Sequence, residues 1–70
     1  MREFTMVIER DEDGWYVATV PELRGCHTQA KSLDSLRKRV VEAIQACLEA
    51  EGATAKGVEF VGVQRIKVPA

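Results

Sequence analysis

The chain contains no long apolar segment of the kind that enters a membrane. Its apolar runs are only a few residues long, whereas a membrane-spanning helix needs roughly 20 consecutive apolar residues. After Met1 the N-terminus passes directly into an alternating pattern, without the apolar stretch and cleavage site of a secretory signal. We therefore expect a cytoplasmic protein that makes no contact with a membrane.

Cysteine is also scarce, and the chain is short. Two cysteines in 70 residues cannot build a dense disulfide scaffold, and the spacing of a structural zinc site is missing. A chain of this length buries only about 60% of the surface that its unfolded form exposes, so its own hydrophobic core is small. We expect self-association, as a homodimer or a tetramer, to supply the missing stability.

An excess of basic residues, which nucleic-acid-binding proteins usually have, is missing as well. The formal net charge is −1, which favours a basic protein partner over a phosphate backbone. Lys31 and positions 37–39 form the one local basic cluster, but three consecutive helix positions spread over about 200°. Solvation of a helix surface therefore explains this cluster better than contact with RNA, and we expect no direct binding of DNA.

The sequence offers no set of side chains that predicts catalysis or a bound metal. The acidic run 11–13 precedes a glycine, but position 20 is valine where an EF-hand calcium loop needs glutamate, so we interpret the run as a hairpin tip. Cys26 and His27 are neighbours on a predicted strand and project to opposite faces, which disfavours a joint metal site or an activated thiol. We expect neither an enzyme nor a cofactor.

What the sequence does contain is a succession of strand and turn signals. Apolar and polar residues alternate over 2–10, and aromatic and β-branched residues dominate 15–20, which predicts two strands. The charged residues and glycine between them predict a hairpin turn, which makes the two strands antiparallel. Pro21 ends the second strand because it lacks a backbone donor, and a third, shorter strand is predicted over 26–29.

A helix is predicted over 33–51. Ser32 is a suitable N-cap because its hydroxyl can accept a hydrogen bond from the first turn, and Asp34 places a negative charge at the positive end of the helix. Apolar residues recur at three- and four-residue steps along one face, at Leu33, Leu36, Val40, Ala43, Ile44, Cys47 and Leu48. Gly52 is in the place of a helix stop, and the apolar residues of 58–68 predict a final strand.

These elements predict an α+β protein of order β-β-β-α-β, with a small antiparallel-rich sheet and one helix on one face, as a single domain over 1–70. One helix covers only one face of such a sheet. On the second strand Trp15, Val17 and Thr19 share one face, and the alternate residues, beginning with Tyr16, share the other. If the helix covers the face of Tyr16, the first three residues form the interface with a partner or a second copy.

The run 13–26, together with Thr28-Gln29 and the helix start Ser32-Leu33, resembles the core of the HicB-like antitoxins. In that family the segment typically reads D-G-x-Y-x-x-x-x-P-x-L-x-G, continues with T-Q and leads into a T-L-E-E-A helix start. Two departures are local. Ala30 stands where the family commonly has glycine, and Asp-Ser-Leu at 34–36 replaces E-E-A, which removes the glutamate of a capping box.

The resemblance implies a protein that binds a small, basic HicA-type mRNA interferase and neutralises it by covering its RNA-binding surface. It also implies a partial ribonuclease H-like fold. Longer members of the family add a DNA-binding segment, and because this sequence stops at Ala70 we expect no binding of promoter DNA by the chain alone.

Two alternatives to a toxin-binding antitoxin remain open. An orphan member of the family would be a homo-oligomeric binding module without a toxin partner. A degenerate ribonuclease-H-like enzyme would need several converging carboxylates, and Glu9 is almost alone on the predicted core strands. An adjacent reading frame that encodes a small basic protein would favour the antitoxin.

Overall fold

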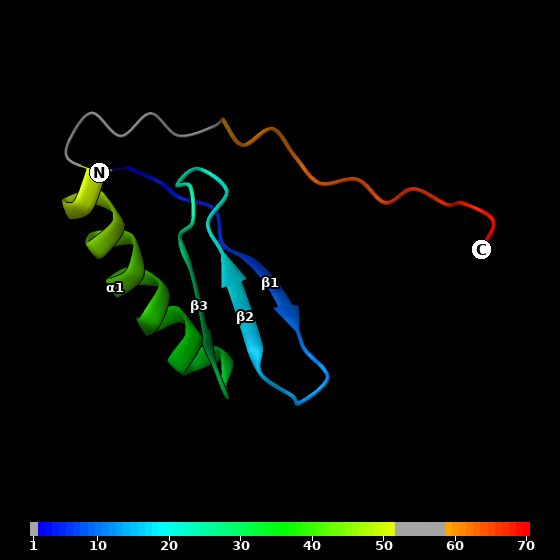
Figure 1. Cartoon of the computed structure of the whole chain (residues 1–70), viewed down its shortest axis with the longest axis horizontal. Helices are drawn as coiled ribbons and strands as arrows, with labels where there is room; N and C mark the ends of the chain where they lie inside the picture. Colours follow the sequence, from blue (N-terminus) through cyan, green and yellow to red (C-terminus); the bar gives the residue numbers. More distant parts are fainter. Residues whose placement is uncertain (1, 52–58) are drawn as a thin grey trace.

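The structure, a computed structural model, describes residues 2–51 and 59–70 and shows a three-stranded sheet followed by a helix (Figure 1). The elements are β1 (Val7–Arg10), β2 (Tyr16–Thr19), β3 (His27–Ala30) and α1 (Leu33–Glu51). The sheet has the order β1-β2-β3, and both strand pairs are antiparallel. The predicted α+β class, with a helix after a three-strand meander, is confirmed.

Asp11 organises the hairpin between β1 and β2. Its Oδ1 accepts hydrogen bonds from the backbone N–H groups of Asp13 and Trp15, each at 2.9 Å. Its own backbone N–H donates to the Trp15 carbonyl at 2.9 Å. Gly14 has a φ of 82°, a conformation that glycine adopts without steric cost. The acidic run therefore forms the tip of a hairpin, as predicted.

A compact turn joins β2 to β3 and contributes to the hydrophobic core. Val20 N–H donates to the Cys26 carbonyl at 2.9 Å, and Cys26 N–H donates to the Leu23 carbonyl at 3.2 Å. Gly25, with a φ of 72°, supplies the left-handed residue of the turn. Because the turn closes tightly, Leu23 packs into the core with 2% of its side chain exposed.

Ser32 is the N-cap of α1. Its Oγ accepts a hydrogen bond from the Ser35 backbone N–H at 3.1 Å, and its carbonyl accepts one from Leu36 N–H at 2.9 Å. Leu36 and Val40 are buried, and the apolar stripe continues with the half-buried Ala43, Ile44, Cys47 and Leu48. Leu33, in contrast, is 51% exposed, because it lies in the first turn, immediately after the chain leaves β3.

The hydrophobic core lies between α1 and one face of the sheet. Its buried members are Ala18, Val20, Leu23, Cys26, Ala30, Leu36 and Val40. The helix packs against β3 and, less extensively, against β2, so β1 is the strand that the helix covers least. Phe4 and Met6 still reach the core, but Ile8 within β1 is 43% exposed.

The first two strands are shorter than the sequence pattern predicted, the third is shifted by one residue, and the final strand is not formed by the described residues. The bounds 7–10, 16–19 and 27–30 replace 2–10, 15–20 and 26–29, whereas the helix bounds 33–51 agree. Residues 59–70 form no strand, and Figure 1 shows them leading away from the sheet. This corrects the prediction over 58–68: a strand needs a hydrogen-bonded neighbour, and the described part of this single chain provides none for 59–68. Position 58 and the predicted helix stop at Gly52 lie outside the described residues.

Candidate partner-binding face of the sheet

The two faces of the sheet differ in what covers them. The register pairs Ala18 with Ile8 on one side and with Thr28 on the other, so these residues share the face on which α1 packs. Val17 and Thr19 project to the opposite face. In the described part of the chain no helix or strand lies over that side (Figure 1). The structure therefore divides the residues of β2 between the two faces as the alternation predicted.

Val17 is at the centre of the uncovered face. Glu9 of β1 and Gln29 of β3 are its cross-strand neighbours. The next row along the strands consists of Val7, Thr19 and His27. Cross-strand neighbours lie about 5 Å apart and successive residues on one face about 7 Å apart, so the two rows form one continuous patch.

Trp15 and Lys31 add a further row to this patch. Because Tyr16 pairs with Ala30, Trp15 and Lys31 are the next residues to meet across the strands. The Lys31 ammonium lies 4.2 Å from the centroid of the Trp15 ring, within the range of a cation–π interaction. The outer face is the name used below for Val7, Glu9, Trp15, Val17, Thr19, His27, Gln29 and Lys31.

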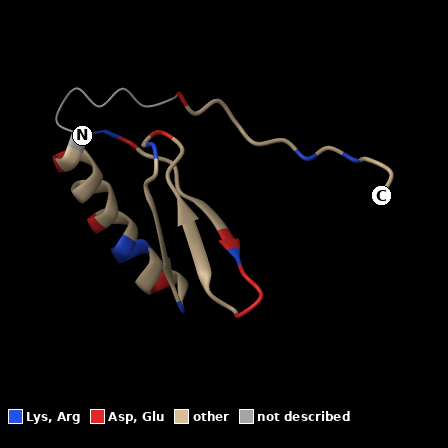
Figure 2. Ribbon diagram, viewed as in Figure 1, with Lys and Arg blue, Asp and Glu red and all other residues tan. Residues whose placement is uncertain are grey.

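Acidic side chains gather on the β1 side of the outer face. Glu9 lies on β1, and the run 11–13 forms the adjoining hairpin, where all three residues are exposed; Figure 2 shows this side in red. Arg10 belongs to the helix side of the sheet, where its guanidinium lies 5.5 Å from the centroid of the Tyr16 ring. The β1 side of the outer face is therefore suited to a basic partner.

Cys26 and His27 point to opposite sides of the sheet, as predicted. Cys26 is 1% exposed and belongs to the core, whereas His27 is exposed and its Nδ1 lies 3.1 Å from the Gly25 carbonyl oxygen. Within residues 2–51 and 59–70, no three His, Cys, Asp or Glu side chains come close enough to hold a metal ion. His27 thus offers the outer face a polar contact.

The basic residues of α1 are separate from Lys31. Positions 37–39 are exposed along the helix, while Lys31 lies over Trp15. A groove between α1 and β3 is lined by Thr28, Ser35, Lys38, Arg39, Glu42 and Ala43. Arg39 Nη1 donates to the Gln29 carbonyl at 3.4 Å, which ties the helix to β3. Glu42 shares the groove with Lys38 and Arg39. Its negative charge weakens the attraction of the groove for phosphate.

Glu22 connects the N-terminal segment to the turn after β2. Its carboxylate accepts hydrogen bonds from the Thr5 backbone N–H at 2.9 and 3.1 Å and from the Thr5 hydroxyl at 2.8 Å. Burial raises the pKa of Glu22, but hydrogen bonds from the Thr5 hydroxyl and from backbone N–H groups outweigh burial, so the pKa lies below its usual value. This contact holds in place the segment from which Phe4 and Met6 reach the core.

Sequence reasoning missed two of these contacts. It grouped Lys31 with the basic cluster of the helix. The register pairs Tyr16 with Ala30, so the next residue on each strand, Trp15 and Lys31, would also be expected to meet. The bond between Thr5 and Glu22 joins residues 17 positions apart, and no local pattern signals such a pairing.

The sequence matches one known family over almost all of its length. Residues 4–67 match the HicB_like antitoxin of bacterial toxin-antitoxin system. The chain belongs to the HicB-like antitoxin family. The resemblance drawn from the run 13–26 and the helix start is thereby confirmed.

Relatives of similar length occur in archaea and bacteria. A UPF0150 protein of Archaeoglobus fulgidus is 58% identical over 94% of each chain, and one of Synechocystis is 42% identical over 96% of each. A UPF0150 protein of Thermotoga maritima is 38% identical over 93% of this chain and 88% of its own. No solved structure matches the chain. The similarity therefore extends through the whole domain and is not confined to one motif.

Membership of an antitoxin family indicates a regulatory binding protein. The outer face is one surface of the described structure that neither α1 nor another strand covers. The match includes 59–67, so the segment beyond α1 belongs to the family domain. Among the described residues no helix is both long enough and apolar enough to cross a membrane.

Proposed function

We propose that this chain is the antitoxin of a type II toxin-antitoxin system that binds a HicA-type mRNA interferase. The antitoxin covers the surface with which the toxin binds RNA. It acts in the cytoplasm by stoichiometric occlusion and not by catalysis. The family match over 4–67 supports the antitoxin class, and the open outer face supports a protein partner.

The observation that carries this proposal is the position of Trp15 and Val17. Both are half-buried on a face that no element of the described chain covers. Complete burial of an apolar side chain is worth roughly 1.5–3 kcal/mol, and tryptophan is enriched among the residues that dominate binding energies. The polar neighbours Thr19 and Gln29 surround these two side chains with hydrogen-bonding groups. This combination of an apolar centre and a polar rim is that of a protein-binding surface.

Charge favours a basic toxin as the partner. Glu9 and the hairpin run 11–13 place acidic groups along the β1 side of the outer face. Complementary charge accelerates association and selects between partners, and salt screens the effect. We therefore expect toxin binding to slow as the salt concentration rises.

Self-association is a second part of the proposal. Among the described residues the core has seven buried members, and a chain of 70 residues buries only a modest share of its surface. Assembly into a homodimer or a tetramer adds buried surface and raises the stability of the folded chain by mass action.

The test is neutralisation of a HicA-type RNA-cleaving protein, and the candidate is a small basic protein encoded by an adjacent reading frame. Mixed in equal amounts, the chain is expected to abolish RNA cleavage by that protein and to form a discrete complex, measured by light scattering. Val17→Glu, which places a charge at the centre of the outer face, is expected to weaken the complex at least tenfold. The matched control is Val41→Glu, because Val41 is 52% exposed on α1 and lies off the outer face.

Each result has a defined meaning. A chain that neither binds nor inhibits the neighbouring protein contradicts the antitoxin proposal and leaves the orphan homo-oligomeric module. Inhibition that survives Val17→Glu but is lost with Val41→Glu moves the toxin site from the outer face to the exposed surface of α1.

A further inference from the structure

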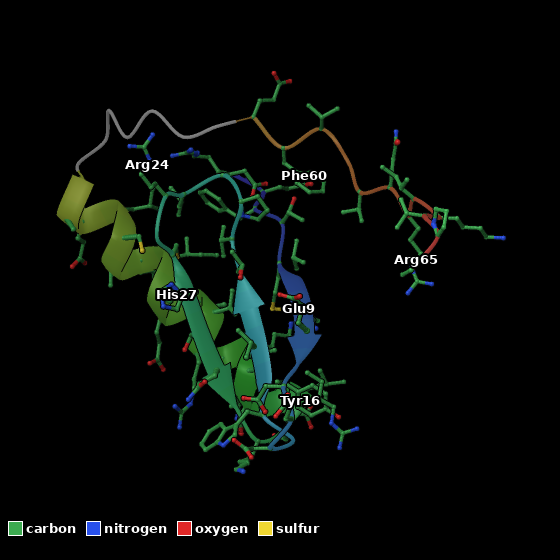
Figure 3. The ribbon with its side chains drawn as sticks, turned by 45° about the vertical axis from the view of Figure 1, so that its right-hand side comes forward. Glu9, Tyr16, Arg24, His27, Phe60 and Arg65 are labelled. Carbon is green, nitrogen blue, oxygen red and sulfur yellow. The ribbon has the colours of Figure 1, made fainter. Side chains whose placement is uncertain are left out.

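The segment beyond α1 exposes large apolar side chains to solvent. The exposed fractions are 91% for Val61, 74% for Val63, 80% for Ile66 and 70% for Val68. Figure 1 shows the segment leading away from the sheet and the helix, and Figure 3 places Phe60 and Arg65 apart from Glu9 and Tyr16 of the sheet. Contiguous exposed apolar side chains on a protein domain mark an interaction site.

The residues of this segment are those of a strand. Valine, isoleucine and phenylalanine, which are enriched in strands, make up most of 60–68, and proline appears only afterwards, at Pro69. Every residue of 60–68 therefore keeps a backbone N–H for a strand ladder. A side chain built on Gly62 would meet nothing within 4 Å, so the segment is open on this side to an incoming partner.

The sheet has two edges, and they are not equally accessible. α1 packs closely at the β3 edge, and the Arg39 guanidinium donates a hydrogen bond to the Gln29 carbonyl there. The β1 edge has no comparable cover among the described residues, and Ile8 is 43% exposed there. An uncovered edge presents backbone donors and acceptors that pair readily with another strand, so β1 is the better receiving edge.

The charges of the segment and of the β1 edge are complementary. The segment carries Arg65 and Lys67 against the single acidic Glu59. The β1 edge carries Glu9 and Arg10 and continues into the acidic run 11–13, so acidic residues outnumber basic ones there. Figure 2 shows blue residues near the end of the segment and mainly red residues, with one blue band, along the β1 hairpin. The β3 edge, next to Lys31, would repel the segment.

We propose that residues 59–68 of one copy dock as an added strand on the β1 edge of a second copy. Reciprocal docking of the two segments closes a two-fold dimer and covers both β1 edges. Alternate residues of a docked strand project to opposite faces, so the apolar side chains on the helix side of the sheet are removed from water. Because the segment leads away from its own sheet, the occupant of each edge comes from the other copy. The inference specifies how the proposed self-association occurs and does not depend on a toxin.

The test uses the full chain alone. Light scattering on the unchanged chain is expected to give twice the monomer mass of 7.8 kDa, and hydrogen exchange is expected to show protected amides in 60–68 and along β1. The double variant Val61→Asp with Val63→Asp is expected to be monomeric and to lose both regions of protection. Helix content by circular dichroism is expected to stay unchanged, because these side chains lie outside the core and are mostly exposed in the single chain. The control is Val41→Asp, which introduces an aspartate at an exposed position of α1 and is expected to leave the dimer intact.

Several results would overturn the proposal. A monomeric unchanged chain with protected amides in 60–68 would mean that the segment folds onto its own sheet. An oligomer that persists in the double variant would place the self-association elsewhere, and protection along β3 in place of β1 would reverse the choice of edge. Since no toxin is present, none of these results bears on toxin neutralisation.

Discussion

At the scale of single residues, the Glu22 carboxylate makes the stability of the chain depend on pH. Its pKa in the folded chain lies below the ordinary value of 4.5, so on acidification the unfolded chain takes up the proton first. Stability from this group is therefore fully present above about pH 4.5 and is lost as the pH falls through the folded pKa. Glu22→Gln is expected to cost about 1 kcal/mol at neutral pH and clearly less near pH 3, measured by urea unfolding.

A suitable control is Glu12→Gln at the exposed hairpin tip, which changes the same net charge without touching Thr5. It is expected to alter the free energy of unfolding little at either pH. If the two variants lost the same free energy of unfolding at neutral pH, net charge and not the hydrogen bonds to Thr5 would account for the effect of Glu22.

The candidate site shows how far single residues could be predicted. Strand alternation has a period of two, so Trp15, Val17 and Thr19 could be assigned to one face without a structure. The partner that lies over Trp15 could not be assigned, because it depends on the register between β2 and β3. That register is set by a turn in which Leu23 packs into the core and Gly25 takes a positive φ, and neither property follows from composition.

At the scale of elements, the stability of α1 depends on its N-cap. The Ser32 hydroxyl satisfies the Ser35 N–H at 3.1 Å, and the first turn of a helix has no backbone acceptor for this donor. Ser32→Ala is expected to reduce the free energy of unfolding by about 1 kcal/mol, measured by chemical denaturation. Ser32→Asp is expected to retain most of the stability, because its carboxylate accepts the same bond and also favours the positive helix end.

Ser35→Ala tests whether the loss is specific to the cap. Ser35 contributes its backbone N–H to the cap and not its hydroxyl, and alanine is the better helix former, so this variant is expected to be as stable as the unchanged chain or slightly more so. A loss equal to that of Ser32→Ala would contradict the role of Ser32.

The elements themselves differ in how well local sequence specifies them. The bounds of α1 agree with the prediction because a cap and an amphipathic stripe are both local signals. The first two strands lose residues at their ends and the third is shifted by one residue, because pairing and not propensity decides where a ladder stops. The segment 59–68 has strand-forming residues but no neighbour in the described part of its own chain. The pattern of a single sequence predicts strand propensity for this segment but does not specify a strand with which it pairs.

At the scale of the whole molecule, the two faces of the sheet differ, because one packs on α1 and the other, the proposed binding face, is covered by no element of the described chain. Trp15→Ala removes a ring from the outer face and its contact with Lys31. We expect it to weaken the complex with the toxin at least tenfold, the scale of an interface hot spot, measured by titration calorimetry.

The midpoint of thermal unfolding of the Trp15→Ala variant without toxin is expected to change little, because the core residues keep their contacts.

A substitution of the neighbouring aromatic residue, Tyr16, is expected to have the opposite effect. Tyr16 packs against the core on the helix side, so Tyr16→Ala is expected to lower the free energy of unfolding by roughly 2–4 kcal/mol while leaving the outer face in place. If Trp15→Ala unfolded the chain and Tyr16→Ala abolished toxin binding in a folded one, the two faces would have exchanged roles. The same pair of variants therefore tests the fold and the function together, because neighbouring residues on one strand serve different surfaces.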